Sequence, residues 1–478
     1  MKKLLLLSLF WCCAYALAET PPTMAIRNAK IVTVSGPVIA KGTVIVRKGL
    51  IEAVGENVTI PADAIIVDGE GMTVYPGLID ALSTVGIPGA APAAAAGGGG
   101  GGRGGRNAAA PAQTAAPAAA AAAPATRSWG PEDRPQTTSW LVAADELQAG
   151  DRRVETVRGS GITTAVTFPT RGIFAGQGSI IDLVSGEKAA EMVLVPEAGQ
   201  YISLGGGGRG GGGGGGGGFP SSLMGTISYI RQLYLDADHY KLVKDAYAKD
   251  PRGMQRPEYD RALEGLLASK RILIPANQLL EIDRMLRFGA ELKQPMILYG
   301  AREAYRPEAI ELLKKANTTV LLSLRWPTAP ARAAASADGE DTNESLRTLI
   351  ERDQAPTAPA ALQKAGIKFA LYSDGQDTPR DFQRAVKKAI DNGLSRDEAL
   401  RALTLSPAQI YGIADRVGSI EKGKIANLVV TKGEIFDDRT TVVMVFVDGK
   451  KYNPGETAAP GGRGGAAATD DPGPGGKR

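Results

Sequence analysis

This chain of 478 residues contains one histidine, His239, and therefore only one imidazole side chain. Imidazole is the usual base of a Ser-His-Asp triad and a frequent metal ligand. A triad would need this one residue in a cleft, and the sequence has no G-x-S-x-G motif. His239 lies within an amphipathic run from Ile230 to Tyr247, so we expect it on the exposed face of a helix. The sequence therefore favours neither a triad nor a centre built from several histidines.

Cysteine chemistry is confined to the N-terminus, where Cys12 and Cys13 lie within residues 1–18. This segment is typical of a secretory signal peptide, because two lysines precede an apolar run that ends in the A-x-A motif Ala16-Leu17-Ala18. The alternative, a membrane anchor, is disfavoured because the run is shorter than the roughly 20 residues that span a bilayer. We therefore expect export to the periplasm or beyond the cell, no membrane span after cleavage, and no disulfide or thiolate site in the mature protein.

Composition excludes some further classes of function. The net charge of +4 is small and evenly spread, which argues against a nucleic-acid partner. Residues 88–127, 205–218 and 455–478 are dominated by Gly, Ala and Pro, and we predict two disordered inserts and a disordered tail. The glycine run at 205–218 lacks the Lys-Ser or Lys-Thr of a phosphate-binding loop. Paired carboxylates could do acid–base work, but their spacing across loops does not reveal a pair.

The chain divides into two kinds of predicted structure, and any functional site must be built on one or both of them. The ends of the chain read as β-structure, and the middle alternates strand and helix, which predicts a parallel sheet. A capping box at Ser395 to Glu398 and the stop at Gly393 mark helices in this middle part. The strands predicted at the ends are Ile31–Val34, Thr43–Val46, Leu50–Val54, Ile65–Val67, Ala426–Val430 and Val442–Val447; those in the middle are Gly161–Val166, Arg271–Pro275, Pro295–Tyr299, Thr319–Leu324 and Ile367–Tyr372.

Two motifs resemble the amidohydrolase superfamily, specifically its imidazolonepropionase-like branch. The segment Val74 to Thr84 contains P-G-L-I-D-A and resembles the family's first barrel strand. The segment Gly418 to Val430 resembles the signature G-S-L-E-x-G-K-x-A-D-L-V-V, with Asn427 in place of the usual Asp. The resemblance covers roughly residues 24–204 and 219–452.

The resemblance implies an α/β fold. It would be a TIM-like (β/α)₈ barrel over residues 77–410, with a composite β-sandwich built from residues 24–76 plus 411–452.

The resemblance also locates the family's metal ligands, which are two His after strand one, one His after each of strands five and six, and an Asp after strand eight. In this chain the corresponding residues are Leu82, Thr84, Pro275, Tyr299 and Asp374. Because Leu, Pro and Tyr are not ligands that hold a hydrolytic Zn²⁺, we expect no metal site and no cofactor.

Asp374 is the candidate catalytic residue, because in relatives the matching Asp binds metal and transfers the proton of water. A turn residue ahead of Gly375 is the alternative interpretation. Asp377 and Asp80 are nearby candidates for a site made only of oxygen ligands, although Asp80 is discounted because it more often fixes the strand end.

Two functions remain open. By resemblance the chain is a hydrolase of C–N bonds, other than peptide bonds, in cyclic amides or related compounds. The alternative is a catalytically inactive binding or partner subunit that uses the barrel as a scaffold. Its partners would be a small-molecule ligand, a second copy of the chain, or a homologue that has kept the metal ligands.

Overall fold

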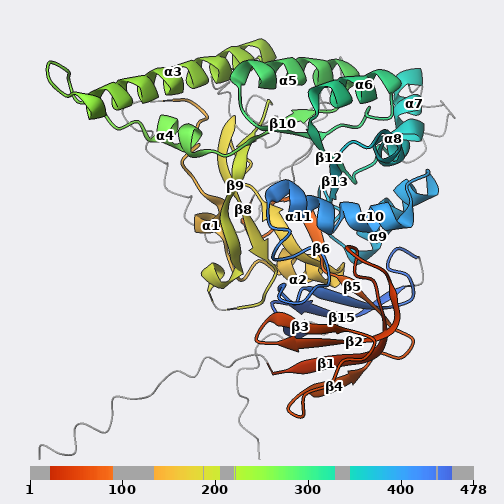
Figure 1. Cartoon of the computed structure of the whole chain (residues 1–478). Helices are drawn as coiled ribbons and strands as arrows, with labels where there is room; N and C mark the ends of the chain where they lie inside the picture. The colour runs from red at the N-terminus through yellow and green to blue at the C-terminus, as the bar shows by residue number, and fades with distance from the viewer. Residues whose placement is uncertain are drawn as a thin grey trace, which may run out of the picture.

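The computed structural model describes residues 22–89, 134–186, 188–204, 220, 222–328, 345–437 and 440–454. It places a β-module beneath a barrel, with the red N-terminal and blue C-terminal strands side by side in the module (Figure 1). The predicted signal peptide, the insert at 205–218 and the tail at 455–478 lie outside the described residues, as does the insert at 88–127 apart from its first two residues.

The β-module is one eight-stranded sheet to which both ends of the chain contribute, as predicted. Its path is β16-β15-β14-β5-β1-β2-β3, and β4 pairs with β1 off this path. Leu50 also bridges Ile425, which brings the β3 edge back toward the chain that enters β14. The strands are β1 (Met24–Ile31), β2 (Ile39–Arg47), β3 (Leu50–Gly55), β4 (Ile65–Asp68), β5 (Thr73–Pro76), β14 (Leu428–Lys432), β15 (Thr441–Val447) and β16 (Lys450–Tyr452).

Two tight turns hold the N- and C-terminal parts of this sheet together. Lys48 and Gly49 both have positive φ, at 52° and 79°, and so do Asp448 and Gly449, at 50° and 71°. This is the backbone that two-residue hairpins with a right-handed twist require. A Cβ on Gly449 would lie 2.7 Å from the Cα of Gly49, so the two turns pack directly against each other.

The barrel is an eight-stranded sheet that runs in chain order from β6 to β13. Seven of the strands are parallel, as the alternation of strand and helix predicts, but β8 pairs antiparallel with both of its neighbours. The prediction of a parallel sheet is therefore wrong for this strand. The strands are β6 (Leu78–Ser83), β7 (Ile162–Thr167), β8 (Phe174–Asp182), β9 (Val193–Ile202), β10 (Ile272–Ala276), β11 (Met296–Gly300), β12 (Thr319–Ser323) and β13 (Phe369–Tyr372).

Helices cover the outside of the barrel, and α3 extends beyond it as the longest (Figure 1). Ser395 caps α10, because its side chain accepts from the backbone N–H of Glu398, but the predicted capping box is incomplete, since the Ser395 N–H donates to Gln363 Oε1 at 3.2 Å. The helices are α1 (Ala143–Glu146), α2 (Arg152–Gly159), α3 (Leu223–Lys249), α4 (Arg261–Ala268), α5 (Leu279–Leu292), α6 (Pro307–Ala316), α7 (Leu346–Gln354), α8 (Ala358–Ala365), α9 (Pro379–Asp391), α10 (Arg396–Ala402) and α11 (Leu405–Tyr411), with short 3₁₀ turns at Ala189–Met192 and Ala355–Thr357. Within the described ranges, no helix combines the length and apolarity needed to cross a bilayer.

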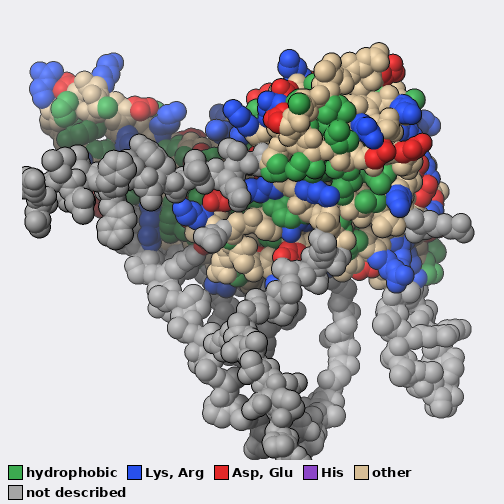
Figure 2. All heavy atoms as spheres, turned by 90° about the horizontal axis from the view of Figure 1, so that it is seen from below, with side chains coloured by type: hydrophobic (Ala, Val, Ile, Leu, Met, Phe, Trp, Pro, Cys, Tyr) green, Lys and Arg blue, Asp and Glu red, His purple; other side chains and the backbone are tan. Residues whose placement is uncertain are grey.

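The surface on the side of the β-module mixes charges of both signs. Lys and Arg side chains are interspersed with Asp and Glu across the face that Figure 2 shows, and no single-sign patch dominates it.

Candidate functional site

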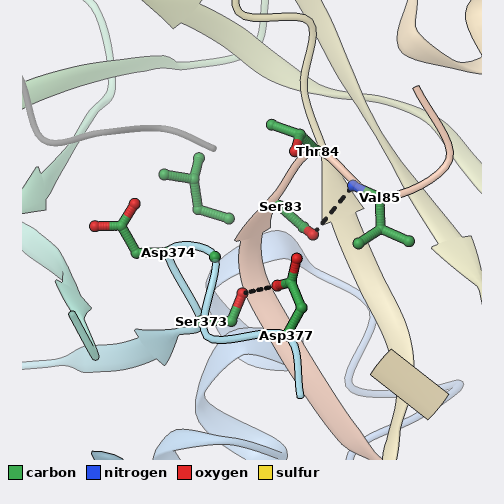
Figure 3. Close-up of a pocket in the computed structure, with 8 residues that line it drawn as sticks. Ser83, Thr84, Val85, Ser373, Asp374 and Asp377 are labelled. Atoms are coloured by element: carbon green, nitrogen blue, oxygen red, sulfur yellow. Dashed lines mark hydrogen bonds between the residues drawn. The ribbon is translucent and has the colours of Figure 1, made fainter. Parts of the chain in front are cut away.

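The candidate site lies at the C-terminal mouth of the barrel, where the first and last strands meet. A small cavity of about 10 Å³ opens between the end of β6 and the loop after β13, which is about the space that one water molecule needs. Figure 3 shows the hydroxyl and carboxylate groups that surround it. The lining residues are Leu82, Ser83, Thr84, Val85, Ser373, Asp374, Gly375 and Asp377.

Asp374 is the second residue after β13 and is almost fully buried, at 2% exposure. Its Oδ2 accepts a 2.7 Å hydrogen bond from Ser323 Oγ, whereas its Oδ1 has no partner among the described residues. Burial raises the pKa of Asp374, although the Ser323 bond and the charges of Arg325 and Arg302 oppose that rise. Its carboxylate points away from Asp377, toward the neighbouring strand ends (Figure 3).

The turn interpretation of Asp374 also has support. Its φ is 50°, and Gly375 follows at 81°, so the chain passes through two left-handed residues. Asp tolerates this conformation better than most residues, at a cost of the order of 1–3 kcal/mol for a strained site. The residue therefore shapes the turn and presents a carboxylate at the same time.

Asp80 and Asp377 flank Ser373 on the other side of the cavity. Asp80, on β6, accepts from the Ser373 backbone N–H at 3.0 Å and from Ser373 Oγ at 2.6 Å. Asp377 Oδ1 lies 3.4 Å from the same hydroxyl. Burial raises the pKa of Asp80 from 3.8 to about 7 despite these bonds, and burial also raises the pKa of Asp377. Asp80 thus ties the first barrel strand to the end of the last one, which is the structural role expected for it.

Arg153 from α2, a residue that was not predicted to belong to the site, holds the loop after β6. Its guanidinium donates to Thr84 Oγ1 at 3.1 Å, to Thr84 O at 2.9 Å and to Ile87 O at 2.7 Å. Asp151, the N-cap of α2, pairs with Arg153 at 2.8 Å and accepts from the Gly86 N–H. A fixed cation therefore occupies the edge of the mouth next to Thr84.

Apolar and aromatic side chains fill the barrel below the mouth. Leu82 is buried at 1% exposure, and Tyr299 is buried beside Tyr201, with ring centroids 5.3 Å apart. Tyr299 Oη donates to the backbone O of Ile202 at 3.1 Å. Pro275 is also buried, and it pairs with Tyr299 in the β10–β11 register. Three of the residues that the resemblance aligns with metal ligands are therefore packed side chains.

His239 lies far along α3 and is exposed, as predicted. Among the described residues, no group of three or more His, Cys, Asp or Glu side chains is arranged to hold a metal ion. The oxygen donors at the mouth, two carboxylates and three hydroxyls without an imidazole, do not fit a hydrolytic zinc. We therefore derive no chemical step through a metal.

Three further polar residues at the mouth were not singled out from the sequence. Asn277 follows β10, Arg302 follows β11 by two residues, and Arg325 follows β12 by two. The signal that could have found them is their position, because ligands of barrel proteins bind just beyond the C-terminal ends of the strands.

Comparisons with known proteins find similarity over parts of the chain. Residues 274–452 match the model of the amidohydrolase family. An N-acetylglucosamine-6-phosphate deacetylase from Haemophilus influenzae is 49% identical over 89 residues, which are 18% of this chain and 22% of that protein. The chain thus spans about a fifth of the length of this curated relative.

Solved structures share the fold. An amidohydrolase from Thermotoga maritima MSB8 superposes with a TM-score of 0.66 at 24% identity, over 90% of this chain and 100% of that chain. Molinate hydrolase gives a TM-score of 0.51 at 16% identity, over 94% and 100% of the two chains. The predicted (β/α)₈-type barrel is confirmed, and residues 274–452 are similar to the amidohydrolase family.

Proposed function

We propose that this protein uses its amidohydrolase-type barrel to bind a small polar molecule and does not hydrolyse it through a divalent metal. The observation that carries the proposal is the filling of the barrel by Leu82, Pro275 and Tyr299. None of the three offers a ligand to a hydrolytic metal, and the buried rings occupy space next to the mouth. The mouth nevertheless keeps buried polar groups, which suits recognition of a polar ligand.

The test is metal content, measured by elemental mass spectrometry on the mature protein purified without chelator. We expect less than about 0.1 equivalent of zinc, manganese or iron, since the donors at the mouth are a poor match for each of them. A control portion is incubated with zinc and passed through a desalting column before measurement. Near-stoichiometric metal in the untreated protein would overturn the proposal.

Hydrolysis of a C–N bond is the second candidate function, and the carboxylate of Asp374 favours it. Its Oδ1 is buried without a partner in the part of the chain that the structure describes, and burial raises its pKa above the usual value, which favours a role in proton transfer. The Asp374→Asn variant separates the candidates wherever a hydrolytic activity is measured. Loss of that activity, with the circular-dichroism spectrum unchanged, supports the hydrolase; unchanged activity places the chemistry elsewhere.

A partner subunit is compatible with the binding function. A homologue that has kept the metal ligands could form a hetero-oligomer with this chain, in which this barrel contributes binding only. Co-purification that yields only monomers or homo-oligomers would count against this arrangement. Export remains a prediction from residues 1–18.

A further inference from the structure

We propose that Asn277, Arg302, Arg325 and Asp374 form a binding site for a small zwitterion, such as a free amino acid, at the barrel mouth. The proposal rests on the proposed function and names its ligand class. The arginines and the amide would hold the carboxylate, and Asp374 would accept from the ammonium group.

Buried polar atoms without partners are the first observation. Asn277 is 2% exposed, and neither its Oδ1 nor its Nδ2 has a hydrogen-bond partner among the described residues. The same is true of Arg302 Nε, Arg325 Nε and Asp374 Oδ1. A buried polar atom left unpaired costs roughly 1–3 kcal/mol. Five such atoms at one end of a barrel call for a ligand or ordered water.

The four residues share one edge of the sheet. In the register of the parallel strands, Ala276 of β10 pairs with Gly300 of β11, and Gly300 pairs with Leu322 of β12. Ser323 of β12 pairs with Tyr372 of β13. The residues just beyond these pairs are therefore neighbours around a continuous arc of the mouth, the place where barrel proteins bind ligands.

Backbone strain marks the same arc. Ala301 has φ of 48°, a conformation that costs a residue with a Cβ about 1–3 kcal/mol. Gly300 has φ of 98°, and a Cβ there would lie only 2.5 Å from Asn277 Oδ1. Gly300 thus leaves room for the Asn277 amide. Strained residues of this kind cluster at ligand sites.

The charges along the arc are complementary to a zwitterion. Arg302, Arg325 and Asp374 each stand two residues beyond the end of neighbouring strands, β11, β12 and β13, and the charges of both arginines oppose the rise in the pKa of Asp374. Among the described residues, Arg302 forms an ion pair with Glu351 at 3.8 Å, beyond hydrogen-bond distance. A ligand carboxylate would provide acceptors for the guanidinium and amide donors. A ligand ammonium would satisfy the free Oδ1 of Asp374.

Isothermal titration calorimetry on the full mature chain tests the site with glycine and β-alanine, against acetate and methylamine as probes of a single charge. We expect the zwitterions to bind at least tenfold more tightly than either single-charge probe, because charge-assisted hydrogen bonds form at both ends. Equal affinity for acetate and glycine, tighter binding of inorganic phosphate, or no binding of either zwitterion up to 10 mM would overturn the proposal.

Variants assign the two ends of the ligand. Arg325→Gln should weaken glycine and acetate alike by at least tenfold, whereas Asp374→Asn should weaken glycine and leave acetate unchanged. Arg252→Gln is the matched control, since Arg252 is exposed and pairs locally with Asp250. Any other pattern of losses in correctly folded variants rejects the assignment. A metal-free protein that binds no zwitterion would refute this inference alone, whereas stoichiometric metal would refute the proposed function.

Discussion

Asn427 shows how one residue joins the β-module to the barrel. Its Nδ2 donates to Asp182 Oδ1 at 2.8 Å and to Thr164 Oγ1 at 3.0 Å, and its Oδ1 accepts from the Asp448 N–H at 2.8 Å. Burial raises the pKa of Asp182 to about 6, against the hydrogen bonds from Thr164 and Asn427. An amide can donate to Asp182 where the family signature's Asp could not, so the Asn suits this junction.

Asn427→Asp should destabilise the protein by about 2–4 kcal/mol at pH 7.5, because it removes the donor and faces Asp182 with a second buried carboxylate. Urea unfolding measures this loss of unfolding free energy. The loss should be smaller at pH 5, where one of the two carboxyl groups is protonated.

The exchange variant provides the control for this prediction. Adding Asp182→Asn to Asn427→Asp restores an amide–carboxylate pair and should recover at least about half of the lost stability. Wild-type stability of the single variant at pH 7.5 would contradict this account of the junction.

At the scale of elements, the barrel is closed by side chains at its mouth. The ladder between β13 and β6 is replaced there by the bonds from Ser373 to Asp80. The pKa of Asp80 is raised from 3.8 to about 7, so the folded protein keeps a proton that the unfolded chain loses. Stability from this group is complete below about pH 4 and is lost as the pH rises through about 7.

Asp80→Asn should make the stability of the protein depend less on pH. Asparagine keeps an acceptor for the Ser373 N–H, and its amide can donate to Ser373 Oγ, without a charge to bury. Between pH 4.5 and 7.5 the wild type should lose about 3 kcal/mol more than the variant, at about 1.4 kcal/mol per pKa unit. Urea unfolding at several pH values measures both slopes. Asp415→Asn, at an exposed position, should keep the wild-type slope; equal slopes for Asp80→Asn and wild type would refute the account.

Local pattern predicted the elements whose apolar runs are continuous. The strand expected at Pro295–Tyr299 is β11, one residue further on, while that expected at Ile31–Val34 is wrong, because β1 ends at Ile31. β1 was not predicted at its true bounds because polar residues interrupt its apolar run. β8 was missed because glycines interrupt it; a Cβ on Gly178 would lie 2.2 Å from the Phe168 ring, so packing requires the interruption.

The candidate site was predictable only in part, for a related reason. Asp374 and Asp377 follow β13, and Asp80 lies within β6, so their places on the first and last barrel strands bring them together. Arg153 reaches Thr84 from a helix 69 residues away in sequence. Asn277 acquires its unpaired amide from packing under Gly300. No local pattern encodes either contact.

At the scale of the whole molecule, the chain ends depend on each other. β14 inserts between β5 and β15, and the buried Val430 and Phe446 belong to the same core as Ile26 of β1. The backbone N–H of Gly77 donates to Asn427 O at 2.7 Å just before the first barrel strand. The N-terminal strands therefore cannot complete their core without the last described residues.

Truncation after Gly412 should therefore unfold more than the part it removes. Without β14–β16, β5 presents an unpaired edge, the module core opens, and Asp182 loses its donor. We expect insoluble protein, or a melting temperature lowered by at least about 10 °C, in thermal unfolding followed by circular dichroism. Truncation after Pro454, which removes the predicted tail, is the matched control and should melt within about 2 °C of the full mature chain. A product ending at Gly412 that melts with the full mature chain would mean that the barrel is stable without the module, and the two would then be independent folding units.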